Sequence, residues 1–350
     1  MIRAPATADA LFSLLWGTRP SSDRLLNGDL ASCLRKKPYL DYFRIQCGYF
    51  AKAESSVQEN LDVIKDVVGH LKTGASKKDV LSLRHTAGSS IDILDDASVE
   101  NAANLAARLL IMCSVGRVPH EANPRQYLEW RHDESLKDLV CSHFQSTHTL
   151  NDAVRLPKNF NAWTIEKIGG ITIQLTDSLA DHLLLANDDR TLLIFHHVSF
   201  LERQTSRSIL PKELVDETLH TLGLLFPQAL FTSSNRSTRQ EQKWFKRLCQ
   251  RHFQETHCEA DDRVARCGTL QANERQVERF HYWRDRLVVL KQMYDDSTPA
   301  TLSQWWFDRR NGPQWYTFWV AALVLFITTL LGLVQCIESA LQVYKAYYPS

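Results

Sequence analysis

The sequence predicts an α+β fold that is mainly helical, with a small β-sheet around residues 171–196 and one C-terminal transmembrane helix. Three observations support this prediction: an apolar run over residues 315–337, helical periodicity in residues 1–150, and strand-like alternation after Gly170. The chain has 350 residues, 44% hydrophobic and 23% charged, which is long enough for two domains and an anchor.

The apolar run is the strongest signal in the sequence. Residues 315–337 read WYTFWVAALVLFITTLLGLVQCI and contain no Asp, Glu, Lys or Arg, and about 20 apolar residues suffice to cross a bilayer. A buried core helix is the alternative, but such helices normally carry a polar stripe. Trp315 and Trp319 suit an interfacial aromatic belt, and Pro313 suits a helix start. We therefore predict a transmembrane helix that has the lipid bilayer as its partner.

Flanking charges predict the orientation of this helix. Arg309 and Arg310 precede it, and only Lys345 follows it. Because positively charged residues favour the cytosolic side, we expect the large N-terminal region to be cytosolic. With about 13 residues after the span, insertion is expected to follow synthesis, as in tail-anchored proteins.

Small and polar residues follow one face of the span. Thr328, Gly332 and Gln335 recur at helical spacing, and such a stripe allows close packing of two helices in a membrane. Thr and Gly are also simply tolerated in lipid, so two interpretations remain: a homo-oligomer or partner helix, or no contact at all.

The region before the predicted transmembrane helix divides into segments that differ in their sequence pattern. Residues 1–150 read as mainly helical, with helices expected at 57–71, at 102–112 and from a Ser135 cap to Phe144. Residues 151–300 read as an α+β region ending in a long helix at about 271–294, where Phe280, Leu287 and Tyr294 are spaced seven apart. Residues 301–314 form an aromatic and basic juxtamembrane linker, and residues 338–350 a short tail.

Within the α+β region, specific residues mark the expected elements. Residues 171–175 alternate as a strand does, and an apolar run at 192–195 follows the turn cluster at 187–189. Pro211 opens a helix, because its missing N–H costs little there, and another helix follows from about Thr238. The sheet is expected to have two or three strands.

One group of residues has the chemistry of zinc ligands, since thiolates and imidazoles suit that metal. Their spacing matches no familiar zinc finger, and packing or surface roles are the alternative. The candidates are Cys249, His252, His257, Cys258 and Cys267.

His196 and His197 end the second strand. Alternation along a strand sends adjacent side chains to opposite faces, so we expect structural roles and no shared site.

Composition and missing motifs exclude several classes of function. Lys plus Arg total 41 and Asp plus Glu total 40, so nucleic acid is not an expected partner. The sequence has no G-x-S-x-G, no H-E-x-x-H and no dinucleotide-binding fingerprint, and no cofactor is predicted. Its eight cysteines contain no C-x-x-C, which favours a reducing compartment.

The C-terminal segment TLSQWWFDRRNGPQWYTFWVAALVLFITTLLGLVQCIESALQVYKAY resembles the signature of a family of uncharacterised, C-terminally anchored proteins from filamentous ascomycete fungi. The segments LPKNFNAWTIEKIGGITIQLTDSLADHLLL and ETLHTLGLLFP resemble the same group. The resemblance covers most of residues 98–348 and implies a membrane topology without an assigned activity.

Together these observations predict a single-pass membrane protein that acts as a membrane-localised interaction or scaffold module. A membrane-tethered enzyme is the rival interpretation. A degenerate relative of the CorA magnesium-transporter class is a further alternative, although those proteins use two spans and a Gly-Met-Asn loop. A convergent cleft of His, Cys and Asp or Glu would favour the enzyme, and an exposed apolar patch the scaffold.

Overall fold

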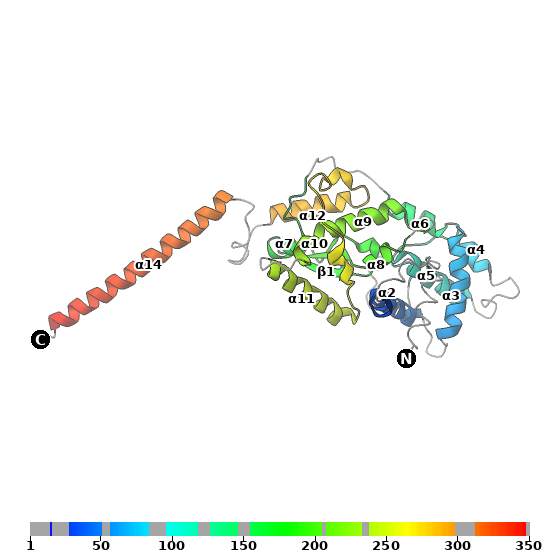
Figure 1. Cartoon of the computed structure of the whole chain (residues 1–350), viewed down its shortest axis with the longest axis horizontal. Helices are drawn as coiled ribbons and strands as arrows, with labels where there is room; N and C mark the ends of the chain where they lie inside the picture. The colour runs from blue at the N-terminus through cyan, green and yellow to red at the C-terminus, as the bar shows by residue number, and fades with distance from the viewer. Residues whose placement is uncertain are drawn as a thin grey trace.

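The computed structural model describes residues 15, 28–50, 57–83, 96–117, 127–145, 155–204, 208–232, 238–297 and 312–347. Among the described residues up to 145, the named elements are all helices (Figure 1). These are α2 (Gly28–Phe50), α3 (Val57–Lys72), α4 (Lys77–Ser82), α5 (Asp96–Ile111) and α6 (Leu136–His143). The central α5 packs against α2, α3 and α4.

Local sequence explains where these helices begin and end. The Ser135 side chain accepts a hydrogen bond from the backbone N–H of Asp138 and so caps α6, as predicted. Beyond the end of α3, Gly74 has a φ of +87°, a conformation that glycine adopts without a steric penalty. The predicted helices at 57–71 and 102–112 are confirmed as α3 and part of α5. The sequence patterns did not identify α2, which contains Pro38.

The second part surrounds a three-stranded sheet. Its elements are α7 (Ala162–Lys167), β1 (Thr172–Thr176), the 3₁₀ helix η3 (Leu179–Asp181), β2 (Leu184–Ala186), β3 (Thr191–Phe195), α8 (Val198–Leu201), α9 (Lys212–Leu225), α10 (Gln228–Phe231), α11 (Arg239–Thr256), η5 (Asp262–Arg266), η6 (Val277–Arg279) and α12 (Arg284–Asp296). The predicted small sheet and the helix starts near Pro211 and Thr238 are confirmed.

The sheet has the strand order β1-β3-β2. Strand β1 runs parallel to β3, with Ile173 opposite Leu192, while β2 pairs with β3 in the antiparallel sense. The turn between β2 and β3 holds Asn187, Asp188 and Asp189 at φ of 55°, 54° and 62°. Asn and Asp tolerate this left-handed conformation better than other side chains, which explains the turn cluster.

A single hydrophobic core joins both parts of the chain. Helices α7 and α11 pack on β1, and α8 packs against α2 of the first part (Figure 1). The Tyr39 ring stacks on Phe200 at a centroid distance of 5.9 Å, and the Phe144 ring lies edge-on to Trp283 at 5.8 Å. The described residues of the regions 1–150 and 151–300 therefore pack together on one shared core.

The predicted long helix at 271–294 is wrong over its first half, because α12 begins only at Arg284. The buried carboxylate of Glu217 accepts hydrogen bonds from the backbone N–H groups of His281 and Trp283, both at 2.8 Å. Those N–H groups are thus used by a side chain of α9. The seven-residue spacing reflects burial of Phe280, Leu287 and Tyr294 in the core of the folded region.

The C-terminal helix α14 spans Gly312–Tyr347, a length of 36 residues or about 54 Å. The most apolar 18-residue window within its stretch Trp315–Tyr344 has a mean hydropathy of 2.5, and none of that window is buried. Figure 1 shows α14 apart from the folded region. The helix contains the predicted span and continues ten residues past Ile337, whereas Arg309 and Arg310 lie outside the described residues.

Candidate functional site

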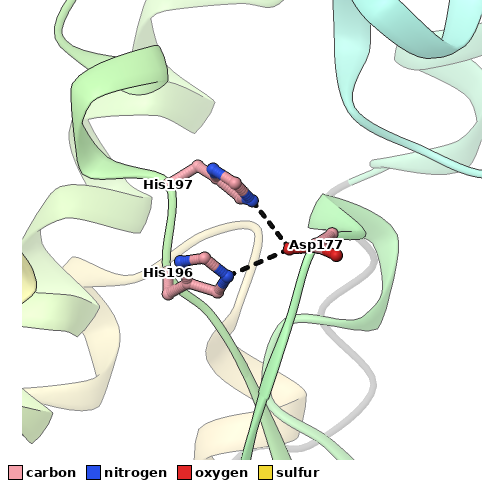
Figure 2. A group of neighbouring side chains, drawn as sticks. All are labelled: Asp177, His196 and His197. Atoms are coloured by element: carbon pink, nitrogen blue, oxygen red, sulfur yellow. Dashed lines mark hydrogen bonds and ion pairs between the residues drawn. The ribbon is translucent and has the colours of Figure 1, made fainter. Parts of the chain in front are cut away.

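Three polar side chains meet where two strands end. Asp177 directly follows β1, and His196 and His197 directly follow β3. Because β1 and β3 are parallel neighbours, their carboxyl ends lie at the same edge of the sheet. Figure 2 shows both imidazoles directed at the Asp177 carboxylate. We call Asp177, His196 and His197 the His–Asp cluster.

Both histidines bond to one oxygen atom. The Nε2 atoms of His196 and His197 lie 3.0 and 2.8 Å from Oδ1 of Asp177. An ionised carboxylate only accepts hydrogen bonds, so each Nε2 carries a proton and donates it. The side chains of His196 and His197 are 0% and 2% exposed and that of Asp177 is 25% exposed, so water reaches the cluster from the aspartate side.

A third imidazole adjoins the cluster. The rings of His196 and His197 stack at 4.0 Å with an interplanar angle of 29°, and the His252 ring of α11 lies edge-on to His196 at 4.6 Å. Nδ1 of His252 is buried and makes no hydrogen bond within the described part of the chain. Such an unsatisfied buried nitrogen is uncommon in folded proteins.

The chain segment after α11 forms a hydrogen bond with the His196 ring. The backbone N–H of Asp261 donates to Nδ1 of His196 at 3.3 Å. The buried Asp261 carboxylate in turn accepts the backbone N–H of Ser199 at 2.6 Å. With Nε2 as donor and Nδ1 as acceptor, His196 is held as a neutral imidazole of defined tautomer.

Electrostatics shift the pKa values of Asp177, His196 and His252 downward. Burial by itself raises the pKa of Asp177, but the hydrogen bonds from His196 and His197 lower this pKa well below its usual range. Burial, together with His197, lowers the pKa of His196. Burial and the neighbouring His196 lower the pKa of His252 to about 4. The site therefore combines the Asp177 carboxylate with the neutral imidazoles of His196 and His252.

The expectation that His196 and His197 point to opposite faces and share no site is wrong. Strand β3 ends at Phe195, so the alternation rule does not extend to the two histidines. His197 adopts φ −78° and ψ 70° at the start of α8, where the backbone turns. This turn brings both rings to the same carboxylate.

The five zinc candidates do not gather into one such group. Within the described residues, the His–Asp cluster is the group of three or more ligand side chains whose donor atoms lie close enough to hold an ion, at 4.8 Å or less from one another. Cys249 and His252 lie on α11, exposed His257 ends that helix at φ 57°, buried Cys258 follows, and Cys267 follows η5. Of the five, His252 contacts the cluster.

The membrane-face candidates lie along α14. The Trp315 and Trp319 rings contact each other at 6.2 Å near its start. The Thr328 hydroxyl donates to the carbonyl of Val324 at 3.0 Å, within its own helix. Apart from its two chain neighbours and the backbone of its own helix, no described atom lies within 4 Å of the position that a Cβ of Gly332 would take, so this face is open.

Two imidazoles and one carboxylate form a donor set suited to metal coordination and to proton transfer. Comparison of the chain with protein-family models, with curated proteins and with solved structures finds no match.

Proposed function

We propose that the protein is a single-pass membrane protein whose folded region is held at the cytosolic face of a membrane by α14. The observation that carries this proposal is the exposure of α14: none of the most apolar 18-residue window within Trp315–Tyr344 is buried by the described residues of the chain. At about 25 cal/mol per Å² of apolar surface, leaving such a helix in water is very costly, and lipid removes that cost.

The length of α14 is compatible with this proposal. A hydrocarbon core of about 30 Å needs about 20 residues, and the helix of 36 residues exceeds that. The excess is accommodated by tilt or by helical turns in the interface. Tyr344 and Tyr347 near the C-terminal end are exposed and suit the interfacial belt.

A scaffold role would use the open face of α14 as its interaction surface. Thr328, Gly332 and Gln335 lie on this face, and small residues there permit close approach of a second helix. The folded region itself offers little apolar surface: within its described residues the large exposed hydrophobic side chains are Phe253 and Val289. Helix–helix association in the membrane is therefore the form of scaffolding that we propose.

A membrane-tethered enzyme is the second candidate function, and the His–Asp cluster favours it. Perturbed titratable groups gathered at the carboxyl edge of parallel strands are typical of functional sites. A relative of CorA transporters is less supported, because that class uses two spans and the described residues contain one helix long and apolar enough.

Alkaline carbonate extraction tests membrane insertion. We expect the full chain to stay in the membrane pellet, since carbonate removes peripheral proteins only. Leu325→Arg together with Leu330→Arg should release the chain, because each charge at the centre of a span costs about 3 kcal/mol. The control pair Leu325→Val and Leu330→Val should remain in the pellet. Release of the unaltered chain would reject the proposal.

A further inference from the structure

We propose that Asp177, His196 and His197 bind one divalent transition-metal ion, using two imidazole nitrogens and one carboxylate oxygen. The three donor atoms lie within 4.8 Å of one another, which is the spacing expected of ligands around one ion. They come from two strand ends held in fixed register by the parallel pairing of β1 and β3. This proposal does not depend on whether α14 crosses a membrane.

The donor set selects the class of metal. Imidazole suits Zn²⁺, Fe²⁺ and Co²⁺, whereas Mg²⁺ and Ca²⁺ prefer oxygen ligands throughout. Three protein ligands leave one position of the coordination shell free for water or a substrate. This arrangement is found in catalytic zinc sites, whereas structural zinc sites have four protein ligands. The Asp177 side chain is 25% exposed, so solvent reaches this side of the cluster.

A hydrogen-bonded cluster that binds no metal is the competing explanation. The positions of the ring protons distinguish such a cluster from a metal site. In the structure both Nε2 atoms donate to Asp177. Metal binding requires a free lone pair on each Nε2, so the proton of each ring moves to Nδ1 through exchange with water. No proton is gained or lost overall, and the carboxylate oxygen turns from acceptor into ligand.

For His196 this shift ends the hydrogen bond that Nδ1 accepts from the N–H of Asp261. Two buried donors, the N–H of Asp261 and the new Nδ1–H of His196, then face each other without an acceptor, and each costs about 10- to 100-fold in an equilibrium constant. Structural zinc sites in zinc-finger peptides have apparent association constants on the order of 10⁷ M⁻¹ or more. The two unpaired donors therefore weaken binding without preventing it at such an affinity.

One further observation favours a ligand at this place. Nδ1 of His252 is buried beside the cluster with no hydrogen-bond partner in the described part of the chain. Such an unsatisfied nitrogen is uncommon inside a folded protein.

Metal titration of the full-length chain in detergent tests the proposal, with Zn²⁺ and Co²⁺ as probes against a competing chelator. We expect one equivalent per chain. His197→Gln and Asp177→Asn should each weaken binding by at least about 100-fold, since even losing a partner of a ligand costs 10- to 100-fold. The control His257→Gln alters an exposed histidine outside the cluster and should bind as the unaltered chain does.

The Co²⁺ absorption spectrum decides the result even where a variant fails to fold. Nitrogen and oxygen ligands give visible d–d bands without thiolate charge transfer, which is the expected spectrum. A thiolate charge-transfer band would place the ion on cysteines and overturn the proposal. Binding below one equivalent, or equal binding by folded His197→Gln and the unaltered chain, would overturn it too.

Discussion

Asp177 and His197 are twenty positions apart in sequence, yet Nε2 of His197 donates a 2.8 Å hydrogen bond to Oδ1 of Asp177. The bond joins the end of β1 to the start of α8 and therefore crosses between two strands that run side by side. His196 donates to the same oxygen at 3.0 Å. This shared acceptor makes Asp177 important for stability as well as for the proposed metal site.

Replacing Asp177 should destabilise the fold. Hydrogen bonds to a charged group contribute about 1.5–3 kcal/mol, and Asp177→Asn removes the charge that both histidines share. We expect the free energy of unfolding without added metal to fall by about 2 kcal/mol, measured by urea denaturation in detergent. Asp189→Asn is the matched control, because exposed Asp189 has φ 62° and Asn tolerates that conformation. Equal stability of the two variants would contradict the role of Asp177.

Buried His182 should make stability depend on pH. Its Nε2 lies 2.7 Å from the Thr221 hydroxyl, its Nδ1 accepts the N–H of Phe195 at 3.1 Å, and burial followed by the charge of Arg286 lowers its pKa to about 3. The folded pKa lies below the unfolded value of about 6.5, so the neutral ring stabilises the fold above pH 6.5 and this contribution is lost as the pH falls toward 3.

The measurement is the free energy of unfolding between pH 7 and pH 4. His182 should contribute a slope of up to about 1.4 kcal/mol per pH unit. His182→Gln keeps an amide that donates and accepts hydrogen bonds but does not titrate, so its slope should be smaller by that amount. Parallel pH profiles for the two proteins would show that His182 is not the titrating group.

Glu217 should stabilise the chain segment before α12. Its carboxylate accepts the backbone N–H groups of His281 and Trp283, so Glu217→Ala leaves two N–H groups without their acceptor. We expect a loss of about 2–4 kcal/mol in the free energy of unfolding. Exposed Glu213 lies on the same helix and serves as control, since Glu213→Ala should cost less than about 1 kcal/mol. Similar losses for both variants would refute this role of Glu217.

Gly332 should govern association of α14 in the membrane. Gly332→Ile fills an open position on the Thr328, Gly332 and Gln335 face and should abolish crosslinked dimers of the full chain in membranes. Leu333→Ile changes a neighbouring exposed position at constant size and should leave the crosslinking yield unchanged. Monomer alone in the unaltered chain would count against association through this helix.

The sequence predicted the elements whose signals are local. The C-terminal helix follows from its composition, and α6 and α9 follow from Ser135 and Pro211 at their starts. The long helix before the membrane was predicted incorrectly, because the contact that ends its pattern comes from Glu217, more than sixty residues earlier. Periodicity alone does not report such a competitor for backbone hydrogen bonds.

The His–Asp cluster was missed for a related reason. The two strand patterns placed Asp177 and His196 directly after separate strands, which was a usable signal. Combining the two patterns into one site requires the parallel pairing of β1 and β3. The short strand β2, which lies between them in sequence, conceals this pairing. The zinc candidates were chosen by closeness in sequence, whereas His252 meets His196 through the packing of α11 on the sheet.

Protease protection of the full chain in sealed membrane vesicles tests most directly whether α14 crosses the membrane with the folded region outside. Epitope tags at the two ends report each side separately. The proposed topology predicts that protease added outside removes the N-terminal tag and leaves the C-terminal tag protected until detergent is added. Digestion of both tags without detergent, or protection of the N-terminal tag, would contradict it.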